Sequence, residues 1–203
     1  MRLLQATLAA SFVALALAGA AAAGPFDDAL AAAERGDYAT ALRLLRPLAD
    51  QGDPDAQYNL GVMYNNGDGV SQDYAEAMKW HRKAADQGNG NAQFNLGFMY
   101  DRGRGIPQNY AEAVKWYRLA AYQGVAVAEY KLGIMYQDGQ GVQQDYVQAH
   151  MWFDLAASQF PASEIESRDD AVKARDFVAS KMSPKQIADA RRLARGWKPR
   201  PER

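Results

Sequence analysis

The sequence predicts an all-α fold in which pairs of helices stack into an α-solenoid, closed by a C-terminal capping pair. Three observations predict it. Residues 55–90, 91–126 and 127–162 align without a gap at a period of 36, and the first two copies share 21 residues. Apolar residues recur at helical spacing within each copy. A glycine turn and a helix-capping residue separate the two apolar runs of each copy.

The first segment, residues 1–23, has the pattern of an export leader. Arg2 supplies a positive charge, a short apolar run follows, and Ala21-Ala22-Ala23 fits the small-residue rule for cleavage. The run is short for a membrane-spanning helix, although a retained anchor or a buried helix is the alternative. We therefore expect a signal peptide cleaved after Ala23, a periplasmic or secreted product, and no membrane span after cleavage.

A degenerate helix pair is expected over residues 26–52. Asp37, Tyr38, Ala41, Ala49 and Gly52 lie one 36-residue period before matching residues of the next copy. The turn between its two helices is shorter than in the later copies. This segment therefore predicts an atypical first unit of the solenoid.

The first helix of each repeat carries its apolar residues on one side. In the first copy Ala56, Leu60, Met63 and Tyr64 step by four, three and one residues. Gly61 lies on the same side, and a glycine costs about 1 kcal/mol within a helix. Because this glycine recurs in all three copies, we expect a close helix contact there.

The second helix of each repeat begins after a recurring turn and cap. Gly67-Asp68-Gly69 is expected to reverse the chain through positive φ values. The segment from Asp73 to Glu76 then fits a capping box, in which each end of the box bonds the other's backbone N–H. Trp80 recurs in the later copies at the same helical position, which indicates packing.

Residues 163–197 break the period and are expected to cap the solenoid. One amphipathic helix is predicted from Glu164 to Met182, and a second after the N-cap Ser183 and the proline that follows it. Trp197 is expected to dock this last helix. A divergent pair of this kind covers the apolar end of a solenoid. Residues 198–203 are predicted to be a disordered tail.

These motifs together resemble the Sel1-like repeat, a relative of the tetratricopeptide repeat. The pattern is Ala-x-x-x-Leu-Gly-x-Met-Tyr, Gly-x-Gly, Asp-Tyr-x-x-Ala-x-x-Trp and Ala-Ala, strong over residues 55–160 and looser over 26–52. The resemblance implies a right-handed α/α superhelix whose concave face serves adaptor or scaffold roles. Several bacterial relatives are secreted or periplasmic. The branch with a disulfide in each repeat is not matched, because this chain has no Cys.

The composition disfavours several function classes. Lys and Arg total 23 against 24 Asp and Glu, so no broad basic face for nucleic acid is expected. No serine begins a Ser-x-x-Lys motif, and His81 and His150 occupy positions that are apolar in other copies. The turn at Asn65 lacks the ligand pattern of a calcium loop. We therefore expect no enzyme, cofactor or metal site, although a Ser-His-Asp triad stays open on sequence alone.

The candidate partner-binding groove consists of first-helix positions that face away from the apolar seam. We predict an exported adaptor that binds a protein or peptide there. A peptidoglycan- or cell-wall-peptide-binding module is the alternative, and an envelope hydrolase of β-lactamase-like type a third. The column Tyr58, Phe94 and Tyr130 lines the groove or packs between units, and sequence does not decide which. The remaining groove residues are Asn59, Val62, Asn66, Asn95, Phe98, Arg102, Lys131, Ile134 and Asp138.

Overall fold

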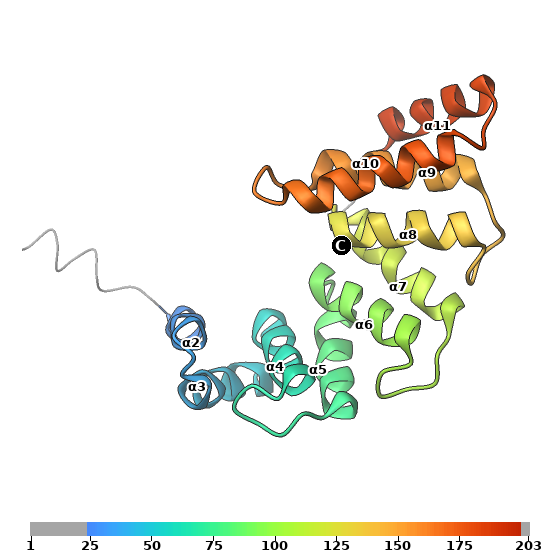
Figure 1. Ribbon diagram of the computed structural model, residues 1–203. Coiled ribbons are helices and arrows are strands. Elements are labelled where there is room, and N and C mark those ends of the chain that lie inside the picture. Colours follow the sequence, from blue (N-terminus) through green and yellow to red (C-terminus); the bar gives the residue numbers. More distant parts are fainter. Residues whose placement is uncertain (1–23, 200–203) are drawn as a thin grey trace, which may run out of the picture.

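The computed structural model describes residues 24–199, and this part of the chain folds into ten helices without a strand (Figure 1). The predicted leader, residues 1–23, and residues 200–203 of the predicted tail lie outside the described range. The helices are α2 (Pro25–Glu34), α3 (Tyr38–Asp50), α4 (Pro54–Asn66), α5 (Tyr74–Asp86), α6 (Gly90–Arg102), α7 (Tyr110–Tyr122), α8 (Ala126–Asp138), α9 (Tyr146–Gln159), α10 (Ile165–Ala179) and α11 (Pro184–Gly196).

The helices form a curved stack of pairs, which confirms the α/α superhelical solenoid. In Figure 1 the chain follows an arc, with α4, α6 and α8 on its inner side and α5, α7 and α9 on its outer side. From α2 to α10, each helix packs on the one before it. The inner surface of the arc is therefore built from the first helices of the repeats.

A glycine on each inner helix lets a ring of the outer helix lie directly against its backbone. A Cβ added to Gly97 would lie 2.6 Å from the ring of Tyr117, closer than real contacts allow. The ring is fully buried. The close contact predicted from the recurring glycine is thus confirmed, and it sets the spacing of the two helix layers. The other two pairs of this kind are Gly61 with His81 and Gly133 with Phe153.

The turn within each repeat has the predicted glycine conformation. Gly67 ends α4 with φ of 83°, and Gly69 has φ of 70°. A side chain on Gly69 would meet the backbone of Tyr38 at the start of the preceding outer helix. The turn therefore closes the repeat and also packs on the preceding unit.

The cap of the second helix is only partly as predicted. The Asp73 carboxylate accepts hydrogen bonds from two backbone amides of α5. The reciprocal bond of a capping box is not formed, because the Asp73 N–H donates to the carbonyl of Tyr64 at 2.9 Å. The Glu76 carboxylate instead pairs with Lys79. This N–H therefore ties the outer helix to the inner one, and the side chain of Glu76 is left for a surface ion pair.

A ladder of glutamine side chains, of which Gln57 and Gln93 are buried, links successive units. Gln57 Nε2 donates to the carbonyl of Ala49 in the preceding unit, and Gln87 donates to Gln57 Oε1 at 2.8 Å. The next repeat makes the same two bonds through Gln93 and Gln123. In the third repeat the position is Glu129, which is fully buried and whose two carboxylate oxygens have no hydrogen-bond partner. Burial raises the pKa of Glu129 to about 8.

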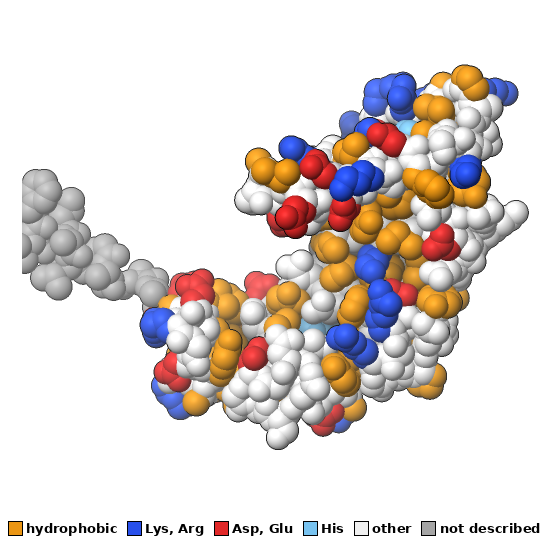
Figure 2. All heavy atoms as spheres, in the orientation of Figure 1, with side chains coloured by type: hydrophobic (Ala, Val, Ile, Leu, Met, Phe, Trp, Pro, Cys, Tyr) orange, Lys and Arg blue, Asp and Glu red, His pale blue; other side chains and the backbone are white. Residues whose placement is uncertain are grey.

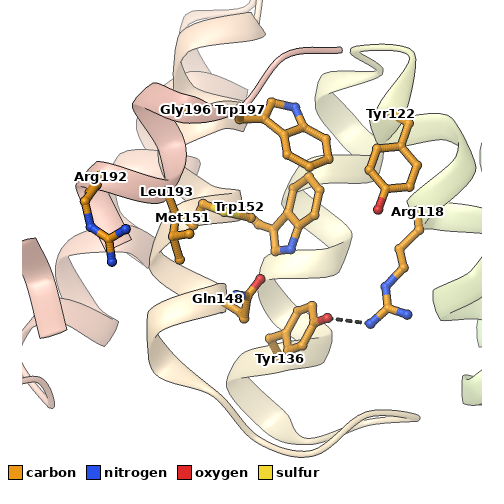
Figure 3. A pocket seen from close by; sticks show the side chains of 10 residues that line it. All are labelled: Arg118, Tyr122, Tyr136, Gln148, Met151, Trp152, Arg192, Leu193, Gly196 and Trp197. Atoms are coloured by element: carbon orange, nitrogen blue, oxygen red, sulfur yellow. Dashed lines mark hydrogen bonds between the residues drawn. The ribbon is translucent and has the colours of Figure 1, made fainter. Parts of the chain in front are cut away.

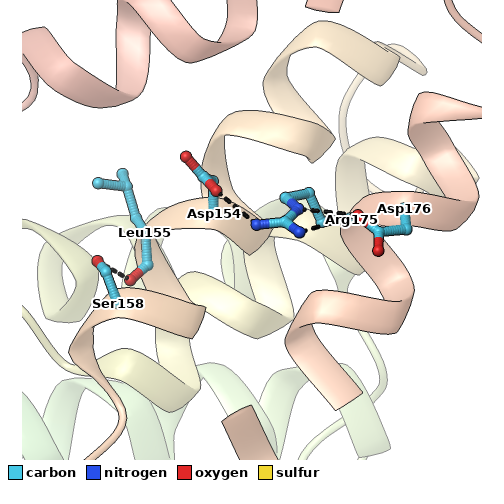
Figure 4. Close-up of polar contacts among 5 residues, drawn as sticks. All are labelled: Asp154, Leu155, Ser158, Arg175 and Asp176. Atoms are coloured by element: carbon cyan, nitrogen blue, oxygen red, sulfur yellow. Dashed lines mark hydrogen bonds and ion pairs between the residues drawn. The ribbon is translucent and has the colours of Figure 1, made fainter. Parts of the chain in front are cut away.

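The capping helices α10 and α11 both pack on α9. Arg175 of α10 donates to Asp154 of α9 at 3.0 Å and also contacts Asp176 (Figure 4). After α11, Trp197 stacks on Tyr122 with ring centroids 5.0 Å apart. It also meets Trp152 edge-on at 4.8 Å, beside a cavity of about 660 Å³ (Figure 3). The predicted capping pair and the docking role of Trp197 are thus confirmed.

Candidate functional site

The predicted groove residues all lie on the three inner helices. Their positions repeat because each helix presents the same columns to the inside of the arc. Figure 2 shows hydrophobic side chains there, with basic side chains gathered among them near the middle. The residues are Tyr58, Asn59, Val62 and Asn66 on α4, Phe94, Asn95, Phe98 and Arg102 on α6, and Tyr130, Lys131, Ile134 and Asp138 on α8.

The aromatic column is half-buried and rests on the outer helix of its own repeat. The ring centroid of Tyr58 lies 5.8 Å from that of His81. Phe94 contacts the ring of Tyr117 at 5.6 Å, and Tyr130 repeats this arrangement on its own outer helix. Each ring is therefore held on one side by the ring seated on the glycine, while part of its surface stays accessible.

The second column begins with two asparagines whose amide groups are already engaged within the chain. Asn59 Nδ2 donates to the carbonyl of Asp55 in its own helix at 2.8 Å. Asn95 Nδ2 lies 3.3 Å from His81 Nε2. Burial lowers the pKa of His81 to about 4, so its ring is neutral at physiological pH and accepts this bond. The Oδ1 atoms of these two amides are thus held in fixed positions.

The column at the C-terminal ends of the inner helices changes its charge from repeat to repeat. Asn66 donates to Asp68 at 3.0 Å, and Asp138 accepts from Gln137 at 3.0 Å, so both ends form local amide–carboxylate bonds. Between them, Arg102 is a cation with a side chain that is 56% exposed. At the C-terminal ends of the inner helices, the middle repeat is therefore the one that carries a positive charge in this column.

Three cations surround one phenylalanine ring at the centre of the inner face. Arg104 lies 5.1 Å from the ring centroid of Phe98, Lys131 5.7 Å and Arg102 5.8 Å. We call these four residues the Phe98 patch. Cations attract the face of an aromatic ring, so these contacts hold the charged groups around Phe98.

The carboxylate nearest to the Phe98 patch is that of Asp101, which is largely buried. Its Oδ2 lies 3.8 Å from Arg102 Nε and 4.0 Å from Lys131 Nζ. It also accepts a hydrogen bond from the hydroxyl of Tyr117 at 3.3 Å. One carboxylate is thus shared among two cations and a hydroxyl group.

Two small cavities flank the Phe98 patch. One, of about 170 Å³, includes Phe94, Asn95 and Phe98 in its walls. The other, of about 160 Å³, is lined by Asp101, Arg102, Lys131 and further residues of α7, α8 and the turns beside them. Pockets for small organic ligands measure about 300–1,000 Å³. These cavities are smaller, and their size suits single side chains of a bound polypeptide.

Sequence reasoning placed Asp101 beside Arg102 on the groove but missed Arg104 and Tyr117 as members of this site. Arg104 belongs to the turn after α6, and the equivalent residues are Asp68 and Gln140. A change from acidic or neutral to basic at a repeat position was the available signal. Its contact with Phe98 depends on the path of the turn, which periodicity does not specify.

Both histidines lie in the interior of the described part of the chain. His81 and His150 are buried, and burial lowers the pKa of each. Ser158 donates its hydroxyl proton to the carbonyl of Leu155 at 2.7 Å (Figure 4). Residues 24–199 contain no group of three or more His, Asp or Glu side chains placed to hold a metal ion. Within the same range, no helix combines the length and apolar character needed to cross a membrane.

Comparisons with known proteins identify the repeat. The Sel1 repeat family matches residues 31–53, 54–89, 90–125 and 126–159. A Sel1 repeat protein from Oxalobacter formigenes is 32% identical with a TM-score of 0.64, over 82% of this chain and 73% of its own.

A protective antigen of uropathogenic Escherichia coli with an SLR fold is 30% identical with a TM-score of 0.56, over 76% of this chain. This chain spans only 40% of the length of that antigen. The comparison with curated proteins gave no match. Three of the four matched segments coincide with the helix pairs α4–α5, α6–α7 and α8–α9, and the first, residues 31–53, covers the end of α2 and all of α3. The chain therefore belongs to the Sel1 repeat family.

Proposed function

We propose that this protein is an exported scaffold that binds an extended segment of a partner protein along the inner face of the arc. The observation that carries the proposal is the half-exposed apolar stripe on α4, α6 and α8, interrupted by two cavities of side-chain size. A solenoid presents an extended concave surface, and hollows of side-chain size along such a groove can receive the side chains of a bound peptide. Sel1 repeat proteins generally mediate protein–protein interaction, which supports the same role.

The fixed amides beside the stripe support an extended ligand. The Oδ1 atoms of Asn59 and Asn95 are one repeat apart and can accept backbone N–H groups of a bound chain. Because their amide nitrogens are held by Asp55 and His81, the acceptors do not have to be ordered on binding. Such preorganisation reduces the entropic cost of association.

Export is part of the proposal and rests on residues 1–23. It predicts that the mature chain begins at Gly24. Cell fractionation of the native host followed by N-terminal sequencing tests this directly. A chain found in the cytoplasm with Met1 intact would contradict export without affecting the groove.

The groove is tested by placing a photo-reactive phenylalanine analogue at Phe98 and comparing it with the same group at Tyr38 on the outer surface of α3. We expect crosslinks to a defined segment of a partner from position 98 and not from position 38. Combined replacement of Asn59, Asn95 and Phe98 by alanine should remove partner capture while the melting transition is retained. Equal crosslinking from both positions would contradict the groove.

The same variants distinguish binding of a partner protein from binding of the cell wall. If the inner face binds peptidoglycan peptides, purified sacculi should retain the wild-type chain and lose the triple variant. A matched triple variant on the outer surface, Arg43→Ala, Lys79→Ala and Lys115→Ala, controls for general changes in charge and adhesion. Retention of all three proteins by sacculi to the same extent would indicate nonspecific adhesion.

A further inference from the structure

The charge of the inner face is concentrated in one place. Position 102 is Arg where the other repeats have Asn66 and Asp138, and position 104 is Arg where they have Asp68 and Gln140. The third cation, Lys131, replaces the asparagines of the two earlier repeats. The Phe98 patch is therefore a local feature of this chain and not a consequence of the repeat pattern.

The positive charge of this patch is incompletely balanced within the protein. Among residues 24–199, Asp101 is the one carboxylate within 4.0 Å of any of the three cations, and Arg104 has no ion-pair partner at that distance. Three positive charges thus share one negative charge, that of Asp101. The Asp101 carboxylate also accepts a hydrogen bond from the Tyr117 hydroxyl. The contacts with Phe98 hold the cations in position without neutralising them.

Lys131 gives this imbalance an energetic consequence. Its side chain is only 20% exposed, and burial lowers the pKa of its ammonium group. A partly desolvated cation that shares its single counter-ion with a second cation is destabilised relative to the same cation with a carboxylate of its own. A ligand that brings a carboxylate to the patch would relieve this cost.

We infer that the Phe98 patch binds an acidic segment of the partner protein, with carboxylate side chains on either side of an apolar residue that lies against Phe98. This inference rests on the proposed function and names the chemistry of its ligand. The central ring and the two small cavities beside it suit individual side chains of a bound segment.

A nucleic acid is a poorer fit. The patch has only three cations, whereas binding of a polyanion requires many phosphate contacts. The groove also becomes acidic toward α10, where Asp170 is close enough to Tyr130 to raise its pKa further. A continuous phosphate chain would meet repulsion there, whereas a peptide with a local acidic stretch would not.

The test selects binders from a library of random short peptides displayed on phage, with the immobilised full-length mature chain as bait. We expect Asp and Glu to be enriched around an apolar residue. Affinities of the selected peptides are then measured for four proteins. These are the wild type, Arg102→Glu/Arg104→Glu, the charge-retaining Arg102→Lys/Arg104→Lys, and the matched control Lys185→Glu/Arg191→Glu on the exposed face of α11.

We expect the reversal in the patch to weaken the binding of the acidic peptides by roughly tenfold or more, because up to two charge pairs become repulsive. The lysine variant should stay within about threefold of the wild type, and the control on α11 should match the wild type. Circular dichroism melts of all four proteins test whether the variants are folded. We expect unchanged melting transitions, because both patch arginines lie on the surface.

The outcomes distinguish the two levels of the proposal. Selection of peptides without acidic enrichment, or affinities that the reversal leaves unchanged, would overturn the acidic ligand while the groove remains a peptide-binding site. Failure to select any binding peptide would overturn the groove itself.

Discussion

Replacing the buried Glu129 by glutamine should stabilise the protein in a pH-dependent way. The first two repeats have Gln57 and Gln93 at this position, and both donate to a backbone carbonyl of the preceding unit. Glu129 is fully buried, and neither carboxylate oxygen has a hydrogen-bond partner. An ionised carboxylate in that position would lack both water and a donor, so the folded protein holds the proton instead.

The size of the effect follows from the pKa of Glu129, which burial raises from 4.5 to about 8. The unfolded chain releases the proton above pH 4.5, while the folded chain retains it until about pH 8. Stability is therefore lost as pH rises between these values, by about 1.4 kcal/mol per pH unit. At pH 7 the cost is about 3 kcal/mol, and above pH 8 it reaches a plateau of about 5 kcal/mol. Glu129→Gln should recover these amounts and change little near pH 4.

Urea unfolding of the wild type and Glu129→Gln, followed by circular dichroism from about pH 4 to pH 9, measures this difference. Gln93→Glu is the matched control, because it places a carboxyl group at the equivalent position of the middle repeat. We expect it to introduce a further pH-dependent loss of the same sign. A stability difference between wild type and Glu129→Gln that is constant over the whole range would refute the reasoning, since it would show that Glu129 ionises normally.

Three further substitutions, together with a control at Gly196, test the packing. Gly97→Ala should destabilise the fold by about 1–2 kcal/mol in urea unfolding, because overpacking against the outer helix exceeds the gain in helix propensity. As the control, Gly196→Ala should be neutral or slightly stabilising, because a Cβ added there has no atom close to it. Arg175→Ala should lower the free energy of unfolding by about 1 kcal/mol, because it removes the bond to Asp154. Hydrogen exchange should show α10 losing protection first. Unchanged protection of α10 would contradict a role of the Arg175–Asp154 bond in holding this helix on α9. Trp197→Ala should lower the free energy of unfolding by about 2 kcal/mol and loosen the packing of α11 on α9. This loosening should appear as faster hydrogen exchange or proteolysis within α11. Unaltered exchange and proteolysis there would show that the docking of α11 does not depend on this ring.

The repeat frame was predictable because its determinants are local and periodic. Gly97 recurs in every copy at a position that faces the neighbouring helix, so a close contact could be expected before the ring that fills it was known. The same holds for the turn glycines. Trp197 was also predicted to dock the last helix, because it follows the end of α11 and stands outside the repeat.

The remainder depends on contacts that periodicity does not encode. The capping box at Asp73 was wrong, because its N–H is already used by the inner helix. The engagement of Asn59 with its own helix, the unpartnered burial of Glu129 and the approach of Arg104 to Phe98 are contacts of individual side chains that the repeat pattern does not specify. A column of equivalent residues therefore predicts where a side chain lies, but not which neighbour it meets.

The position of the capping pair determines where the chain could be lengthened. Both α10 and α11 rest on α9, so the surface that would receive another unit after the third repeat is already covered. The interior of the array has no such restriction. A second copy of residues 90–125, inserted between Val125 and Ala126, would bring its own glycine, outer ring and glutamine. The span of the inner face is thus adjustable by design in steps of one repeat from the middle of the array, with both ends left intact.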